Sequence, residues 1–274
     1  MSEEYNVSNY FYIQSKDRLP GETSSDFRVI NQTFGNCSAF ELSLVQIPYT
    51  FYPINSNNNT LIFNPNASGN VTAVIPQGSY TATSFISALQ TAMNAVSGGP
   101  TYTAAISLTT GQLTITQGTG NFVIVNSKST IYPIIGYSNV DTSSANAQTS
   151  PYPVNLSGTD YIDINSTELT KHDTRSLDTN YQSGRKVIRI PIKDYQWGQT
   201  IQYKPRFHMM NHKPETGDLI DIQLQDMYGY TVNLNNRDWF MKLKYHTDKP
   251  HRKTIRAGNH YDHFSNHSIL ANKN

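Results

Sequence analysis

Residues 40–47 read FELSLVQI, and the order of apolar and polar residues in this stretch indicates the fold class. Phe40, Leu42 and Leu44 alternate with polar residues, which is the period of a β-strand with one buried face. The apolar set then continues at Val45 and Ile47, one position out of register. A shift of this kind predicts either a β-bulge or a strand that is buried on both faces.

The same alternation recurs on both sides of a central stretch of the chain. Turn residues such as Pro20-Gly21 and Asn235-Asn236 separate the alternating segments. Besides 40–47, the predicted strands are 10–13, 27–30, 161–164, 188–192, 200–203, 220–224 and 239–245. About eight short strands with turns between them predict a sandwich or a barrel.

The central stretch contains the one segment with helical periodicity. Between residues 79 and 96, Phe85, Leu89 and Met93 fall on one face, and Gly98-Gly99-Pro100 would end the helix. Three short strands are predicted to follow, at 102–108, 112–116 and 122–125, with the turn between the first two at 109–111. These elements predict a small α+β module, one helix packed on a short-stranded sheet.

The predicted domain organisation follows from these two patterns. The main β-domain comprises residues 1–59 and 139–247, and the α+β module, residues 60–138, is inserted into it. Residues 139–153, rich in Ser, Asn, Ala, Thr and Pro, are predicted to be a loop that leads back to the main sheets. Residues 248–274 are basic and lack periodicity, so we expect a tail that does not fold alone but could dock on another subunit.

Composition limits the classes of function. Only 15% of the residues are charged, against about 25% in an average globular protein, and the formal net charge is +1. This charge argues against a protein that coats nucleic acid, and we expect no nucleic-acid contact from the tail. Cys37 is the single cysteine, so the chain cannot contain a disulfide framework. No apolar run approaches the ~20 residues of a membrane span, and the N-terminal segment shows no secretory signal.

Motifs for catalysis are missing from the sequence. There is no phosphate-binding glycine loop, no nucleophile elbow and no dinucleotide fingerprint, so we expect neither an enzyme nor a cofactor. A hydrolase with an unrecognised site is the remaining enzymatic alternative. His260, His263 and His267 are candidate zinc ligands, because helical spacing would place them on one face. Nothing marks a helix there, however, and a solvated tail is the expected interpretation.

Three segments together resemble a known family. Residues 10–29 read YFYIQSKDRLPGETSSDFRV, residues 40–55 read FELSLVQIPYTFYPIN, and residues 75–137 contain IPQGSYTATSFISALQTAMNAV, TTGQLTIT and IIGY. In this order they resemble the penton, or vertex, capsid proteins of virophages and Polinton-like viruses, within the adenovirus-type lineage. The pattern is also similar to minor virion proteins of large DNA viruses.

The resemblance implies a single jelly-roll β-sandwich that forms a homopentamer at the icosahedral vertices and contacts the major capsid protein. It implies a protein of the virion, assembled in the host cytoplasm or a viral factory. The inserted module would contact other minor virion proteins or a host receptor, and no catalytic residues come with the family. The alternative is a virion attachment protein whose insertion recognises a carbohydrate or a receptor.

Overall fold

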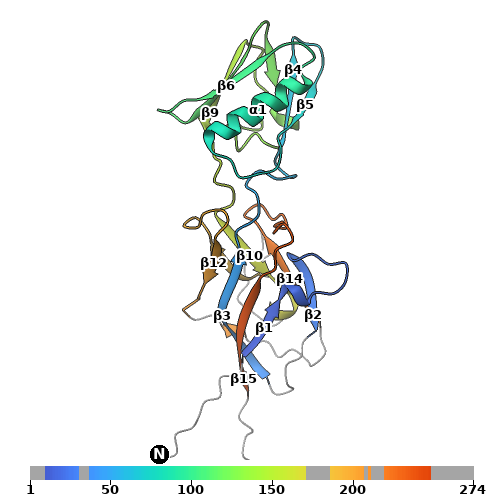
Figure 1. Cartoon of the computed structure of the whole chain (residues 1–274), viewed down its shortest axis with the longest axis vertical. Helices are drawn as coiled ribbons and strands as arrows, with labels where there is room; N and C mark the ends of the chain where they lie inside the picture. Colours follow the sequence, from blue (N-terminus) through green and yellow to red (C-terminus); the bar gives the residue numbers. More distant parts are fainter. Residues whose placement is uncertain (1–9, 31–36, 171–185, 207–208, 211–218, 248–274) are drawn as a thin grey trace, which may run out of the picture.

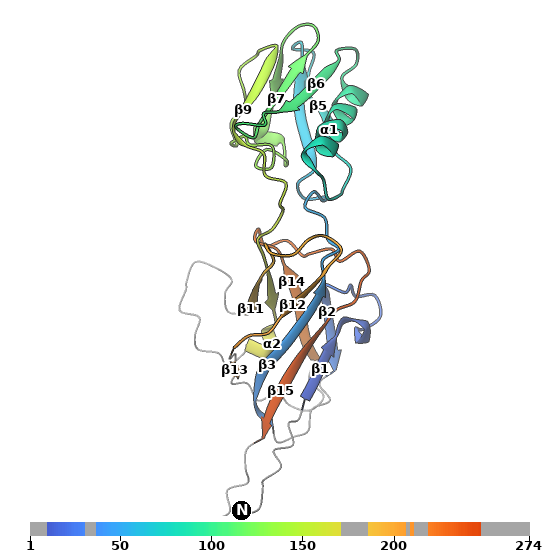
Figure 2. The same cartoon turned by 60° about the vertical axis from the view of Figure 1, so that its left-hand side comes forward.

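The computed structural model describes residues 10–30, 37–170, 186–206, 209–210 and 219–247. The described part of the chain is elongated and consists of two units that follow one another along the long axis (Figure 1). A β-sandwich forms one unit, and the central part of the chain forms the other, which we call the distal unit. Two single segments of chain, 49–59 and 154–160, join them (Figure 2).

Two antiparallel sheets make up the sandwich. The first has the order β1 (Tyr10–Gln14), β15 (Phe240–Thr247), β3 (Cys37–Pro48) and β12 (Thr200–Tyr203), and β13 (Met209–Met210) also pairs with β3. The second has the order β11 (Lys186–Pro191), β10 (Tyr161–Asn165), β14 (Leu219–Gln225) and β2 (Asp26–Ile30). Short helical segments lie at η1 (Ser15–Asp17) and α2 (Thr167–Thr170).

The strand order is that of a jelly roll. If the main strands are counted along the chain without the distal unit and β13, one sheet has the order 1-8-3-6 and the other has the order 5-4-7-2. Two interlocked Greek keys produce this arrangement. The mainly β fold class predicted from the sequence is confirmed, and each of the eight predicted strands of the sandwich is present.

The inward faces of the two sheets form one core. Met241 and Leu243 of the first sheet and Ile190 and Ile222 of the second are at most 1% exposed. Each fully buried aliphatic side chain of this kind stabilises the fold by about 1.5–3 kcal/mol. Alternation along the strands therefore places the apolar residues between the sheets and leaves the outer faces polar.

Strand β3 contains a bulge at the position where the sequence pattern shifts. Leu44 pairs with Lys242 and Leu42 pairs with Leu243, so that Ser43 is an additional residue in β3. Beyond it Val45 and Ile47 are buried, whereas Leu44 is only partly buried. Of the two predicted explanations for the shift, the bulge is correct.

Trp239 links β15 to the connection between β1 and β2. Its indole Nε1 donates to the carbonyl of Ser24 at 2.6 Å, and its backbone N–H donates to Ser15 Oγ at 2.9 Å. The ring is 3% exposed and lies edge-on to Phe27, with the ring centroids 5.9 Å apart. Trp239 thus contributes apolar burial, one side-chain hydrogen bond and one backbone hydrogen bond to one corner of the sandwich.

The distal unit has its own core and its own sheets. Its strands pair in the orders β5 (Val71–Val74), β4 (Thr60–Pro65), β8 (Phe122–Ile124) and β6 (Tyr102–Ile106), β7 (Gln112–Gln117), β9 (Ala147–Pro153), and η2 (Asn126–Lys128) follows β8. Helix α1 (Ala82–Val96) contacts β5 and β6. The core includes Phe63, Tyr102 and Phe122, which meet edge-to-face.

Helix α1 ends at the predicted residue, Val96, and begins at Ala82, three residues after the start of the predicted segment. Thr81 and Ser84 form a capping box, in which each side-chain oxygen accepts the backbone N–H of the other residue. Gly98 has a φ of +69° just beyond the last turn, a conformation that glycine adopts without strain. Phe85, Leu89 and Met93 are fully buried, as their helical spacing predicts.

The prediction of a loop over residues 139–153 is wrong in its second half. Residues Ala147–Pro153 form β9, which pairs with β7 in the distal unit. Gln148 and Ser150 point inward although they are polar, and Gln148 Nε2 is satisfied by the carbonyl of Phe122 at 2.9 Å. An inward face of polar residues has no apolar alternation, so the sequence pattern did not indicate a strand.

The distal unit is also larger than predicted. Strands β4 and β5 were not among the predicted strands, and the unit has two three-stranded sheets. Its core begins at Ile54, and Val154 and Leu156 pack against it. The unit therefore extends beyond the predicted bounds of 60–138 on both sides.

Candidate functional site

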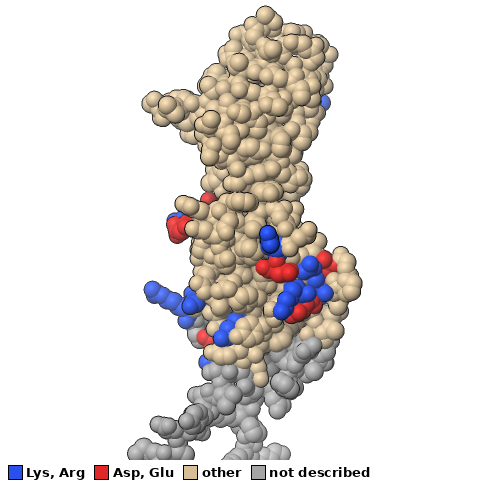
Figure 3. All heavy atoms as spheres, viewed as in Figure 1, with Lys and Arg blue, Asp and Glu red and all other residues tan. Residues whose placement is uncertain are grey.

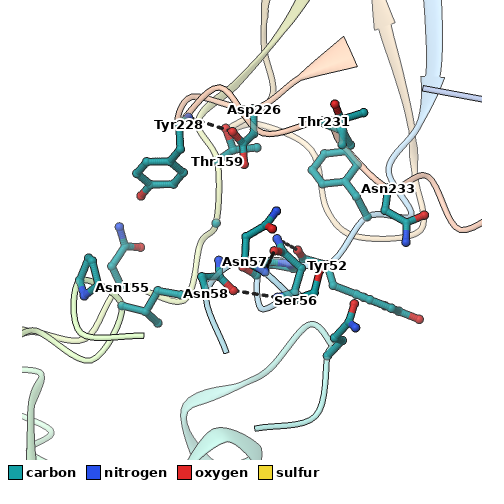
Figure 4. A pocket seen from close by; sticks show the side chains of 18 of the residues that line it. Tyr52, Ser56, Asn57, Asn58, Asn155, Thr159, Asp226, Tyr228, Thr231 and Asn233 are labelled. Carbon is teal, nitrogen blue, oxygen red and sulfur yellow. Dashed lines mark hydrogen bonds between the residues drawn. The ribbon is translucent and has the colours of Figure 1, made fainter. Parts of the chain in front are cut away.

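A pocket lies at the junction of the two units (Figure 4). Its cavity has a volume of about 90 Å³. Residues 49–58 and 158–159 of the two connecting segments and the sandwich loop 226–233 form most of the lining. Gln77, Pro133, Ile134 and Asn155 contribute from the distal unit. We call this site the junction pocket, and neither unit forms it alone.

Asparagine side chains hold the loop that begins the lining. Asn58 Oδ1 accepts the backbone N–H of Asn55 at 2.8 Å, and Asn58 Nδ2 donates to the carbonyl of Pro53 at 2.9 Å. Asn55 Oδ1 accepts the backbone N–H of Asn57 at 3.0 Å. Side chains that mimic backbone turns in this way fix a loop locally. The loop therefore presents Asn57 to the pocket from a defined backbone.

A glycine brings the two connecting segments together. Gly158 has a φ of +77°, and a Cβ atom added there would lie 3.1 Å from the Cα atom of Pro53. Only a residue without a side chain permits this close approach at a positive φ. The contact places the chain leaving the sandwich beside the chain that returns to it.

Among the described residues that line the pocket, Asp226 is the one with a charged side chain. Its Oδ1 accepts the backbone N–H groups of Tyr228 and Tyr230, both at 2.9 Å. Burial raises the pKa of this carboxyl above its ordinary value, although the hydrogen bonds from the backbone act in the opposite direction. The carboxyl closes a tight turn and gives the described lining of the pocket one negative group.

Several side-chain amides at the pocket form no hydrogen bond with the described residues of the protein. Within the described part of the chain, the side chains of Asn57 and Gln77 have no hydrogen-bond partner. Asn155 and Asn233 accept local bonds through Oδ1, but their Nδ2 groups have no described partner. Amides of this kind can both donate and accept, so they suit a ligand with hydroxyl groups.

Aromatic side chains border the same pocket. Tyr228 is 55% exposed and lies on one side of the asparagine loop, opposite Asn233 (Figure 4). Tyr52 lies below Asn233, and its ring stacks on that of Trp197 with the centroids 6.2 Å apart and an angle of 16° between the planes. The site combines free amides, one carboxyl and exposed aromatic rings.

A second polar cluster lies on the outer face of the sandwich, at β10 and β11. Asp163 accepts two hydrogen bonds from Arg189, from Nε at 2.8 Å and from Nη2 at 3.0 Å, and it pairs with Lys186 at 2.9 Å. The guanidinium of Arg189 lies 3.6 Å from the ring centroid of Tyr161. Burial alone raises the pKa of Asp163, but the hydrogen bonds and charges of Arg189 and Lys186 outweigh it and hold the pKa below its ordinary value.

Replacing Asp163 by Asn should lower the free energy of unfolding by about 1–2 kcal/mol at pH 7. Because the folded-state pKa is lowered, the wild-type contribution is present above the ordinary pKa and is lost as the pH falls through the folded value. The variant should lack this part of the acid dependence. Urea unfolding at pH 7 and at about pH 3 measures both effects.

Asp160→Asn is the matched control, because the Asp160 side chain is exposed and makes no described ion pair. This control should unfold like the wild type at both pH values. Equal losses from the two substitutions would show that net charge, rather than the pairing of Asp163, determines the effect.

The structure does not test the candidate zinc ligands named from the sequence. His260, His263 and His267, like the whole basic tail, lie outside the described residues. Within the described ranges no group of three or more His, Cys, Asp or Glu could hold a metal ion. Among the helices of those same ranges, none is long and apolar enough to cross a membrane.

Sequence patterns did not identify the junction pocket. Its residues come from loops that are separated by up to about two-thirds of the chain, and no motif joins them. The available signal was local: the asparagine-rich stretch 55–59 follows a proline, a composition typical of an ordered turn. Such a signal indicates a loop but does not reveal what the loop faces.

No protein-family model matches the sequence, and no curated protein matches it. Among solved structures, the crystal structure of the selenomethionine-labelled mavirus penton protein aligns with 87% of this chain and 99% of its own. The TM-score is 0.44 and the sequence identity is 10%. The mavirus protein is a remote structural neighbour, and a similarity of this size does not establish a shared function.

Proposed function

We propose that this chain is a structural subunit of a virus capsid and forms a homopentamer at the fivefold vertices. It contacts the major capsid protein there, belongs to the virion, and carries out no catalysis. The single observation that supports this most strongly is the jelly-roll order of the sandwich strands. Jelly rolls of this type are frequent in capsid proteins, because their sheets enclose the core and leave the flanks free for neighbours.

The two flanks of the sandwich differ, as a closed ring requires. The edge strands β1 and β2 lie at one flank and β11 and β12 are the edge strands at the other (Figure 2). A ring of subunits joins unlike surfaces, one from each flank. On the β2 flank, Ile30 and Leu219 are cross-strand partners and remain 51% and 43% exposed. This apolar pair supports a subunit contact on that side.

Sedimentation of the purified protein, alone and mixed with its major capsid protein, tests the proposal. A mass five times that of the 30.8 kDa chain is expected in at least one of the two samples. Ile30→Asp should leave the monomer folded but shift the equilibrium toward it by at least about tenfold, because it places a charge in the contact. A folded chain that remains monomeric in both samples would refute the proposal.

We also propose that the distal unit is a module inserted into the sandwich. The contact of Gly158 with Pro53 supports this, because the ends of the insertion then lie side by side. Replacing residues 54–157 with a short Gly-Ser linker should leave a cooperatively folding sandwich. The free energy of unfolding should change by no more than about 2 kcal/mol, since a shorter loop costs little entropy to close.

Urea unfolding of the excised sandwich, followed by circular dichroism, measures that change. The isolated segment 54–157, which contains α1, should show helical signal and fold by itself. If both pieces were unfolded, the two units would form one cooperative domain and the insertion would be disproved.

The alternative function is that of a virion attachment protein that recognises a carbohydrate or a receptor. The junction pocket favours this alternative, since free amides and exposed aromatic rings are groups that bind polar ligands. The two functions do not exclude each other, because the pocket lies at the end of the sandwich and away from the apolar pair on the β2 flank.

A further inference from the structure

Charge is distributed very unevenly along this chain. Residues 42–159 contain only two of its charged residues, Lys128 and Asp141, out of 21 Lys and Arg and 20 Asp and Glu in the whole chain, and none of its eight histidines. On the face in Figure 3 the charged side chains gather on the sandwich, and the distal unit is almost free of them. A surface of hydroxyl and amide groups neither attracts nor orients an ionic partner.

We propose that the junction pocket binds one ring of a neutral saccharide. Each sugar hydroxyl both donates and accepts hydrogen bonds, as the free amides of Asn57 and Gln77 also do. The Nδ2 groups of Asn155 and Asn233 add donors from opposite sides of the pocket (Figure 4). The exposed ring of Tyr228 offers an apolar surface for the C–H face of the sugar.

The size of the cavity agrees with a single ring. Its volume is about 90 Å³ on the scale where one water molecule needs about 10–15 Å³. The cavity therefore exceeds several-fold the minimum that one water requires, so it has room for a small polar ligand. A long glycan would have to leave the pocket at its open side.

The walls of the pocket are fixed before any ligand binds. Hydrogen bonds from the Asn55 and Asn58 side chains hold the loop 49–58. The close approach of Gly158 to Pro53 holds the segment 158–159. Hydrogen bonds to the Asp226 carboxyl hold the loop 226–233. A preorganised site loses little conformational entropy on binding. The carboxyl of Asp226 is the only charged group in the described lining, so it disfavours acidic sugars and the site selects neutral ones. This inference does not depend on the oligomeric state of the protein.

The test is saturation-transfer NMR on the full chain with methyl glycosides of glucose, galactose and mannose, and with glucuronate as the acidic comparison. At least one neutral glycoside should bind with a dissociation constant on the order of 1 mM, as expected for a ligand of this size. Its affinity should be unchanged between low and high salt, because no ion pair forms. Glucuronate should bind at least about tenfold more weakly.

Tyr228→Ala should reduce the affinity at least about tenfold, because it removes the apolar face of the site. Tyr230→Ala is the matched control: Tyr230 is 50% exposed in the same loop but does not line the pocket. This control should bind like the wild type, and thermal melting should show that both variants are folded. Absence of binding by all three neutral glycosides, equal binding of glucuronate, or equal losses from the two tyrosine variants would each overturn the proposal.

Discussion

Replacing Ile222 by Asp is expected to unfold the sandwich or to lower its free energy of unfolding by about 4 kcal/mol or more. Ile222 lies on β14, is 1% exposed, and belongs to the core between the two sheets. A carboxylate there would have no partner among the surrounding apolar side chains. Since folded proteins are stable by only about 5–15 kcal/mol, this loss is a large fraction of the total.

The same substitution at Ile30 is the control. Ile30 lies on the neighbouring strand β2 but is 51% exposed on the outer side. Ile30→Asp should change the free energy of unfolding of the monomer by less than about 1 kcal/mol. Urea unfolding of both variants gives the comparison, and similar losses at the two positions would mean that the assigned inward and outward faces are wrong.

Trp239→Ala is expected to cost about 3–5 kcal/mol, which is the second large effect. The substitution leaves a cavity beside Phe27 and removes the indole donor from the carbonyl of Ser24. That carbonyl then loses its partner in a buried corner, which adds to the loss of packing. Denaturant unfolding followed by circular dichroism measures the change.

The chain has two tryptophans, and the second provides the control. Trp197 is 50% exposed and, among the described residues, stacks on Tyr52 alone, so Trp197→Ala should cost less than about 1 kcal/mol. The variant that retains Trp239 should keep the blue-shifted fluorescence of a buried indole. A red-shifted emission from it would show that Trp239 is in contact with water and that this corner is not packed.

The sandwich could be predicted from the sequence because its strands are buried on one face. In β14, Ile220, Ile222 and Leu224 alternate with Asp221 and Gln223, and the structure buries the first three. The pattern also indicated a bulge in β3 as one of two explanations, because an additional residue shifts the apolar set from one parity to the other. In both cases the apolar alternation in the sequence has the same physical cause, which is burial of one strand face against the facing sheet.

Strand β9 shows the limit of that signal. Its buried positions are occupied by Gln148 and Ser150, whose hydrogen bonds to other segments replace apolar contacts. Pro151 and Pro153 have no backbone N–H to donate to a neighbouring strand. Proline is tolerated here because β9 is an edge strand and, among the described strands, pairs with β7 alone. A strand stabilised by tertiary hydrogen bonds resembles a loop in sequence.

The candidate site was less predictable than the fold for a related reason. The cross-strand register sets the pairing of Asp163 with Arg189, and no local pattern specifies which residues face each other. The junction pocket depends on how two units dock, which brings Asn57, Asn155 and Asn233 together. Each is unremarkable in its own loop, so only the assembled structure shows that their free groups converge.

Electron microscopy of the purified protein, alone and with its major capsid protein, tests most directly whether the sandwich is a ring-forming capsid subunit. Averaged particles are expected to show fivefold symmetry, with the sandwiches joined flank to flank in a ring and the distal units at its periphery or on one of its faces. Single two-lobed particles in both samples, or rings of another symmetry, would contradict the proposed vertex function.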